Sequence, residues 1–233
     1  MYPGHMTHGT LVVTPAHDEE ESVGLVVEGV RGLGLPVLVV DDGSTDNTAV
    51  AASAAGATVL RLPVNAGVGA ALRTGFRYAV RHGFKRVVQV DADLQHPPEG
   101  IPLLLDAADD GAELVIGSRF DSGYDPGARR LGMRLLSALV SRRIGTRVTD
   151  PTSGFKVVTE PLLSEFARSY PAEYLGDTVE ALLQAGSFGA RIVEVPVPME
   201  QRSAGVATTT RHAAGQFGRV LVTIIAGRPA RPR

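Results

Sequence analysis

The sequence has 233 residues, a length that fits one α/β domain of ordinary size with short extensions. Hydrophobic residues make up 44%, enough to build a sizeable core, so the composition excludes a wholly disordered chain. Cysteine is absent, which excludes disulfide frameworks and thiolate metal sites. The first ten residues carry no secretory signal pattern, and no apolar run approaches the roughly 18–20 residues needed to cross a bilayer. These features predict a soluble, cytoplasmic protein.

The formal net charge of −2 hides an uneven distribution. Residues 126–149 contain arginines but no acidic residue, and only basic charges follow Glu200, whereas the acidic residues gather in the first half. This asymmetry predicts a face that meets an anionic partner, either phosphate, a membrane surface or nucleic acid. A solvated arginine-rich surface is the alternative for each single arginine.

In the first half, strand and helix signals alternate. The sequence predicts strands over 10–16, 36–42, 57–63, 85–93 and 112–119, a helix opened by the acidic stretch 18–21, and helices over 48–55 and 67–83. Repeated strand–helix–strand units with short loops indicate a doubly wound, parallel sheet. Such sheets bind ligands at the carboxyl ends of their strands.

The second half is less regular. An arginine-rich helix is expected over 128–144, with Leu131, Leu135, Leu139 and Val140 on its apolar side. Further predictions, in chain order, are a strand over 152–158, a helix over 172–186, a strand over 190–200 and a helix over 209–226.

The segment VDADLQH, residues 90–96, follows a buried strand directly. Asp91 and Asp93 are one residue apart at this strand end, where two carboxylates repel each other unless a cation lies between them. Carboxylate oxygens suit Mg²⁺ or Mn²⁺, which bind through one or two carboxylates plus substrate phosphates. Such a metal would act as a Lewis acid on a diphosphate leaving group. The alternative is a helix cap with surface acids.

Two further acidic segments follow the first and second predicted strands. In VVDDGSTDNT, residues 39–48, Asp41 and Asp42 end a strand, and a carboxylate here could accept hydrogen bonds from a ribose or a base edge; a turn capped by Ser44 or Asp46 is the alternative. In TPAHDEEES, Pro15 and Ala16 would bring backbone close to a nucleotide, with Glu19 as a candidate contact. An acidic first helical turn is the alternative for this second segment.

The segment NAGVGAALRTG, residues 65–75, resembles a dinucleotide-binding glycine loop only in part. Gly67 and Gly69 match its first two glycines, but the third position is Leu72. The segment also follows the third strand instead of the first, which disfavours a dehydrogenase.

Together the segments TPAHDEEES, VVDDGSTDNT, NAGVGAALRTGF, VDADLQHPPE, IGSRF and DPTSGFKVV resemble, in that order, family-2 glycosyltransferases. The similarity is to the branch of dolichyl- or polyprenyl-phosphate mannose and glucose synthases, and it covers roughly residues 10–205. It implies an α/β GT-A fold, with a mostly parallel sheet flanked by helices. It also implies an inverting transfer from a GDP- or UDP-sugar with Mg²⁺ or Mn²⁺.

The resemblance also implies roles for individual residues. The expected nucleotide-sugar contacts are Pro15, Ala16, Asp18, Glu19, Asp42, Asn65, Gly69, Asp91, Ala92 and Asp93. Asp91, Asp93 and Gln95 resemble metal ligands, Arg119 and Arg130 resemble acceptor-phosphate contacts, and Arg202 resembles a basic residue that closes over the diphosphate. Asp93, Arg119 and Arg202 are accordingly the expected catalytic residues.

The sequence departs from the family pattern in two places. The first motif usually reads P-x-Y-N-E, whereas His17 and Asp18 stand here. The loop after Arg202 usually carries G-x-S-K, whereas residues 205–208 contain no lysine. A degenerate sugar-nucleotide-binding module is therefore one alternative function.

The acceptor decides whether a base is needed. A lipid phosphate is already anionic near neutral pH and needs only cations to hold it. A glycan or other hydroxyl acceptor would require a carboxylate base, for which Asp177 and Glu180 are the candidates. The scarcity of aromatic residues disfavours nucleic acid as a partner.

The helices over 128–144 and 209–226 could dock the enzyme peripherally at the inner face of the cell membrane. Packing on the sheet or in a homodimer is the alternative use of these helices. The chain is expected to divide into an extension over 1–9, a catalytic domain over 10–205, and an amphipathic helix with a basic tail over 206–233.

Overall fold

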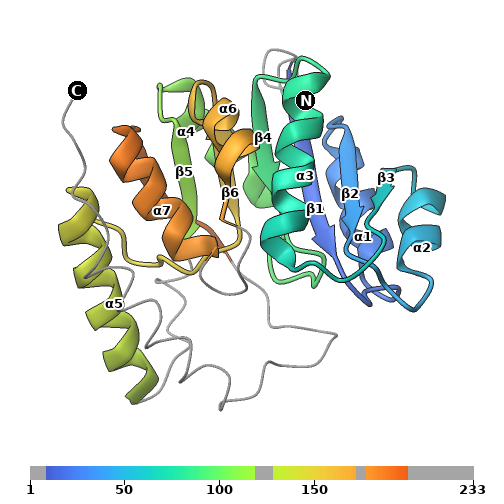
Figure 1. The fold of residues 1–233 in the computed structure, drawn as a ribbon, viewed down its shortest axis with the longest axis horizontal. Helices are drawn as coiled ribbons and strands as arrows, with labels where there is room; N and C mark the ends of the chain where they lie inside the picture. The colour runs from blue at the N-terminus through green and yellow to red at the C-terminus, as the bar shows by residue number, and fades with distance from the viewer. Residues whose placement is uncertain (1–8, 119–127, 172–176, 199–233) are drawn as a thin grey trace.

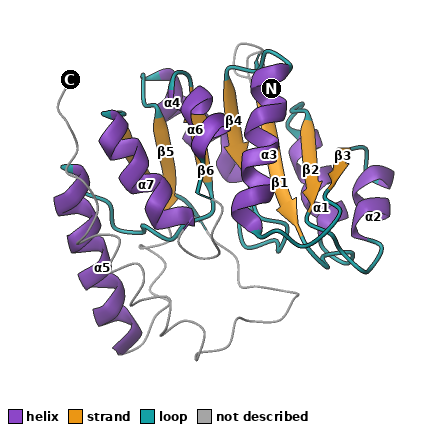
Figure 2. Ribbon diagram, viewed as in Figure 1, coloured by secondary structure: helices purple, strands orange, loops and turns teal. Residues whose placement is uncertain are grey.

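The computed structural model describes residues 9–118, 128–171 and 177–198, and shows helices on both faces of one sheet (Figures 1 and 2). The strands are β1 (Thr10–Ala16), β2 (Val37–Asp41), β3 (Thr58–Arg61), β4 (Arg86–Gln89), β5 (Leu114–Ser118), β6 (Lys156–Thr159) and β7 (Ile192–Pro196). The helices are α1 (Val23–Gly32), α2 (Thr48–Ala54), α3 (Val68–Arg81), α4 (Ile101–Asp109), α5 (Ala128–Ile144), α6 (Leu162–Ser169) and α7 (Asp177–Phe188), with a 3₁₀ turn at Pro98–Gly100.

The seven strands lie in the order β3-β2-β1-β4-β6-β5-β7. Strands β1, β2, β3 and β4 are parallel, as expected from the alternating pattern, and β5 pairs with β7 in parallel. The chain moves outward from β1 to β3 and then returns to place β4 on the other side of β1. This reversal between β1 and β4 is the type of switch point at which open α/β sheets bind ligands.

Strand β6 is antiparallel to both of its neighbours, β4 and β5. The sequence predicts a strand here, but its direction is a finding of the tertiary structure. Because β6 runs the opposite way, its amino end lies at the edge of the sheet where β1, β2 and β4 end. We call this edge the carboxyl edge.

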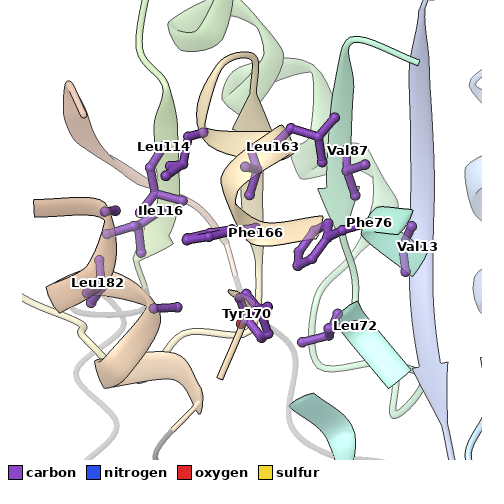
Figure 3. Close-up of a cluster of buried hydrophobic side chains, with 14 of the residues drawn as sticks. Val13, Leu72, Phe76, Val87, Leu114, Ile116, Leu163, Phe166, Tyr170 and Leu182 are labelled. Atoms are coloured by element: carbon purple, nitrogen blue, oxygen red, sulfur yellow. The ribbon is translucent and has the colours of Figure 1, made fainter. Parts of the chain in front are cut away.

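Two hydrophobic clusters cover the two faces of the sheet. One lies under α3, α6, α5 and α7, and the other under α1 and α4. In the first cluster, Phe76 of α3 meets Phe166 and Tyr170, with ring centroids 5.8 Å and 5.0 Å apart (Figure 3). Aromatic contacts of this kind join α3 to α6 and hold both helices on the sheet.

The expected elements differ from the structure in three respects. Helices α4 and α6 are absent from the sequence predictions, and the strand expected over 85–93 ends at Gln89. The apolar side predicted for α5 is confirmed at Val140, which is buried, but it is wrong at Leu135, whose exposure is 54%, because the helix buries Leu136 in its place. The helix expected over 209–226 lies outside the described residues. Among the residues the structure describes, no helix is both long enough and apolar enough to span a bilayer.

Candidate functional site

The loops that follow β1 and β2 are joined by reciprocal hydrogen bonds. The backbone N–H of Asp18 donates to Ser44 Oγ at 3.0 Å, and that of Glu19 donates to Thr48 Oγ1 at 2.8 Å. In return, the N–H of Thr45 donates to Asp18 Oδ1 at 2.7 Å. These bonds satisfy donors near the first turns of α1 and α2 with side chains from another loop. The two loops therefore form one preorganised wall beside the switch point.

Asp18 occupies the position at which the resemblance leads one to expect asparagine. Its backbone has a φ of +53°, in the left-handed region that aspartate and asparagine tolerate better than most residues. Its Oδ1 accepts the Thr45 hydrogen bond, and its Oδ2 lies 3.5 Å from His17 Nε2. Aspartate therefore provides the acceptor that this loop needs. Its expected contact with a nucleotide stays a prediction.

Asp46 anchors the same wall from the β2 side. Burial raises the pKa of its carboxyl, but hydrogen bonds from the hydroxyl and N–H of Thr48 and from the N–H of Glu20 outweigh this, so the pKa lies below 3.8. The hydroxyl of Thr48 thus donates to Asp46 while it accepts the N–H of Glu19. The carboxylate form of Asp46 is the form that holds the two loops together.

Adjacent carboxylates at the end of β2 have separate structural partners. Asp41 is fully buried, accepts the N–H of Ser44 at 2.8 Å and lies 3.2 Å from Arg61 Nε. Asp42 is 4% exposed, and its two oxygens accept the N–H groups of Ala66 and Gly67, each at 2.8 Å. Asp42 therefore fixes the start of α3 from the end of β2, a role that the sequence does not predict.

The remaining expected nucleotide contacts lie around this wall. Pro15 and Ala16 end β1 and are buried, and the Ala16 carbonyl accepts the N–H of Asp42 at 2.8 Å. The Glu19 carboxylate accepts the hydroxyl of Ser22 at 2.8 Å. Asn65 Oδ1 accepts the N–H of Gly67 at 3.2 Å, and Gly69 lies buried in the first turn of α3.

Residues 91–93, Asp-Ala-Asp, follow β4 in a tight turn and are called the acidic triplet after their two aspartates. Leu94 has a φ of +62°, and Asp93 Oδ1 accepts the N–H of Gln95 at 3.1 Å. Asp91 is partly exposed, with Oδ2 3.8 Å from Nδ1 of the buried His96. Ala92, between the two carboxylates, is buried. The turn thus presents two acidic side chains next to the switch point.

Gly154, just before β6, packs directly on Asp91. A Cβ at this position would lie 2.7 Å from Asp91 Cγ and 2.8 Å from its Oδ1, and closer still to Oδ2. The ring of His96 packs at a tilt against that of Phe155, the residue after Gly154, with ring centroids 5.3 Å apart. Buried Lys156 then pairs across the sheet with Gln89. The antiparallel direction of β6 brings this segment to the acidic triplet.

The residues at this turn fit a divalent cation that arrives with a diphosphate. Within residues 9–118, 128–171 and 177–198, no three His, Cys, Asp or Glu side chains form a complete metal cage. Magnesium and similar ions, however, commonly take only one or two protein carboxylates and complete their shell with water and substrate phosphates. Asp91 and Asp93 supply that donor set, and Gln95 contributes its N–H to the orientation of Asp93.

The three arginines expected to contact phosphate groups are described only in part. Arg119 and Arg202 lie outside the described residues, as does the side chain of Arg130, whose backbone belongs to α5. Ser118 immediately precedes Arg119. Its Oγ lies 3.2 Å from Oγ1 of Thr149.

Gly154, Phe155 and Lys156 lie around Asp91, but their segment predicts only a strand from its sequence. His96 was visible in the DADLQH segment, but only the tertiary structure places it in the packing around Asp91. No local pattern could have joined these segments, because the strand order brings them together.

Residues 11–167 match the model of the family described as Glycosyl transferase family 2. The chain belongs to this family. Its matched region spans β1 to α6 and includes the loop wall, the acidic triplet and Gly154. The GT-A fold and the glycosyltransferase activity expected from the resemblance are confirmed.

Two similar proteins have names that combine a phosphorylated polyprenol with mannose. The chain is 33% identical over 217 residues to polyprenol monophosphomannose synthase of Mycolicibacterium smegmatis, covering 86% of this chain and 80% of that protein. It is 31% identical over 227 residues to undecaprenyl-phosphate mannosyltransferase of Micrococcus luteus, covering 92% and 91%.

A solved structure supports the same fold. Glucosyl-3-phosphoglycerate synthase of Mycobacterium tuberculosis, in complex with Mn²⁺, UDP-glucose and glycerol 3-phosphate, aligns with a TM-score of 0.73 and 25% identity. The alignment covers 100% of this chain and 86% of that one.

Proposed function

We propose that this glycosyltransferase moves a hexose, mannose or glucose, from a GDP- or UDP-sugar to a polyprenyl phosphate, with inversion at the anomeric carbon. The observation that carries the proposal is the position of Asp91 and Asp93 at the switch point, beside the wall formed by the loops after β1 and β2. The names of the two polyprenyl-phosphate relatives support the acceptor.

Two residues of the acidic triplet have the proposed metal role. Asp91 and Asp93 would hold Mg²⁺ or Mn²⁺, and the ion would neutralise charge on the departing diphosphate. The Mn²⁺ and UDP-glucose in the related synthase structure support this choice. The loop wall would take up the nucleoside, with Pro15, Ala16 and Glu19 as its proposed contacts.

The transfer needs no general base. An oxygen of the acceptor phosphate forms a bond with the anomeric carbon while the bond from that carbon to the diphosphate oxygen breaks. The electron pair of the broken bond leaves with the nucleoside diphosphate. Because a phosphate monoester is already anionic near neutral pH, no proton has to be removed from it. Arg119 and Arg130 are proposed to hold this phosphate, and Arg202 to cover the diphosphate.

Calorimetry tests the donor and the metal together. GDP-mannose, UDP-glucose and the two nucleoside diphosphates are titrated with and without Mn²⁺. Metal-dependent binding of one nucleotide series supports the proposal and identifies the base. A folded sample that binds none of them would favour the degenerate binding module.

A small phosphorylated acceptor is the second candidate. The related glucosyl-3-phosphoglycerate synthase, which aligns over the whole chain, favours it. A hydroxyl acceptor would need a base, for which Asp177 and Glu180 of α7 stand as candidates. Product analysis with undecaprenyl phosphate and 3-phosphoglycerate offered in parallel separates the two candidates. Product from phosphoglycerate alone would reject the lipid acceptor.

We also propose that α5 docks the enzyme peripherally on anionic lipid. Arg134, Leu135 and Arg142 are exposed on this helix, and Arg147 is exposed just beyond it. Each basic residue near an anionic surface contributes about 1 kcal/mol to binding. Flotation with vesicles containing anionic lipid should carry the wild-type protein upward. An R134E/R142E variant should remain at the bottom, and flotation of both to the same extent would refute the proposal.

A further inference from the structure

Glu194 of β7 binds a loop that lies 44 and 45 residues away in the sequence. The N–H of Thr149 donates to both carboxylate oxygens, at 2.9 Å and 2.8 Å, and the N–H of Asp150 donates to Oε1 at 2.8 Å. Two consecutive backbone donors that converge in this way form a concave anion site, which the carboxylate fills. Hydrogen bonds to a charged acceptor are stronger than neutral ones. Glu194 therefore clamps the loop to the carboxyl edge.

The clamped loop is itself ordered by short-range hydrogen bonds. Buried Asp150 accepts the N–H and the hydroxyl of Thr152 at 3.3 Å and 3.0 Å. The N–H of Ser153 donates to the Asp150 carbonyl at 3.4 Å, and Phe155 donates its N–H to Ser153 Oγ at 3.1 Å. A displacement at the clamp would thus pass along a connected turn towards Gly154.

The loop joins the two halves of the proposed site. At one end, the hydroxyl of Thr149 lies 3.2 Å from that of Ser118, the residue before Arg119. At the other end, Gly154 packs on the carboxylate of Asp91. One short segment therefore contacts both the strand that leads to the proposed acceptor arginine and the proposed metal ligand.

We propose that Glu194 is a positioning residue for sugar transfer. By fixing Thr149 and Asp150, it sets the position of the loop against Asp91 and Ser118, and so sets the geometry between donor and acceptor. This inference rests on the proposed function. Misplacement of reacting groups by about 1 Å can reduce turnover on the order of a hundredfold, so the effect should appear in kcat.

The chain offers a matched control at the opposite end of the same strand pair. Arg191 lies just before β7 and Glu113 lies just before β5, and the N–H of Arg191 donates to Glu113 Oε2 at 2.9 Å. Glu113 is therefore also a carboxylate that binds backbone near β5 and β7, but at the edge away from the acidic triplet. E113Q reports the cost of weakening such a clamp without touching the site.

The experiment compares full-length wild type, E194Q, E194A and E113Q. E194Q keeps the side-chain shape but loses part of the acceptor capacity for the three hydrogen bonds. We expect a fall in kcat on the order of 10–100-fold for E194Q and more for E194A. E113Q should stay within about twofold of wild type, since its clamp lies far from the reacting groups. Amide hydrogen exchange should accelerate at Thr149 and Asp150 in E194Q and E194A, and should stay at the wild-type rate there in E113Q.

The outcomes separate the inference from the function on which it rests. Metal-dependent nucleotide binding by the wild type is measured first, and its absence rejects both. If the wild type binds and transfers, the positioning role alone is rejected by either of two results. One is a kcat near wild type in both E194Q and E113Q. The other is an equal loss of kcat in both variants, because the effect would then be general to the β5–β7 pair. If E194A fails to fold, E194Q decides.

Discussion

Gly154 packs so closely on Asp91 that any side chain at position 154 would overlap the carboxylate of Asp91. The two residues lie 63 positions apart and meet only because β6 runs antiparallel to β4. Glycine is therefore needed at position 154 for close approach, and the carboxylate of Asp91 takes its position partly from the backbone behind it.

Replacing Gly154 with alanine should move Asp91 and weaken metal-dependent nucleotide binding by roughly tenfold or more, because misplaced site groups carry costs of this size. Calorimetry with and without Mn²⁺ measures the effect. Gly32→Ala is the control, since a Cβ there would meet nothing within 4 Å. Unchanged metal-dependent binding in a folded Gly154→Ala protein would contradict the claim that close packing at Gly154 positions Asp91 for the ion.

Asp93→Ala should abolish transfer and leave the fold intact, because the carboxylate is partly exposed, its contact with the N–H of Gln95 is local to the turn, and its proposed role is to hold the metal. Turnover of a labelled sugar nucleotide and the circular dichroism spectrum report the two properties. Asp106→Ala, at an exposed position of α4, should remain fully active. If Asp93→Ala turns over near the wild-type rate, the proposed metal role of Asp93 is contradicted.

Asp42→Asn separates a structural role from a nucleotide contact. An amide can accept at only one of the two positions that now bind Ala66 and Gly67. We expect a loss of about 1–3 kcal/mol in the free energy of unfolding, measured by denaturant titration. A variant of unchanged stability whose nucleotide affinity alone falls would instead support the contact with base or ribose.

Thr48→Val tests the join between the loops after β1 and β2. Valine matches the shape of the buried threonine but leaves the N–H of Glu19 without its acceptor, at a cost of about 1–3 kcal/mol in the free energy of unfolding. Nucleotide affinity should fall as well, because the wall loses its order. Thr58→Val, at an exposed position of edge strand β3, should change neither quantity appreciably. Equal effects from both substitutions would argue against the join.

The stability of α6 should depend on acidity through Glu165. Hydrogen bonds from Arg168 and Ser169 hold the pKa of Glu165 below its ordinary value of 4.5, and burial opposes them only in part. Since the folded-state pKa is depressed, this contribution is present above pH 4.5 and is lost as pH falls through the lowered value. Denaturant titrations across the acid range should show a shallower loss for Glu165→Gln than for wild type. Parallel curves would refute the assignment.

Much of the first half of the fold follows from local sequence. The valine-rich strands and the amphipathic α3 are recognisable because their apolar residues recur at the strand and helix periods. Asp91 and Asp93 are recognisable because they follow a buried strand whose end must lie at the carboxyl edge. The ordered motifs were sufficient to identify the family, which the match over residues 11–167 confirms.

Other features depend on contacts between distant segments. The direction of β6 follows from which edges it pairs with, and no periodicity encodes that choice. The buried side of α5 is centred on Leu136 and Val140, beside α7, so the exposure of Leu135 could not be deduced from the helix alone.

The sequence by itself determined the alternation of elements, the acidic triplet and the family, because these depend on neighbours along the chain. Only the tertiary structure decided that Asp42 binds the start of α3 and that Gly154 supports Asp91. It alone also decided that Glu194 clamps the loop at Thr149 and Asp150. The physical reason is that each of these contacts requires strand order and register, which arise when the whole sheet packs and its buried donors find acceptors.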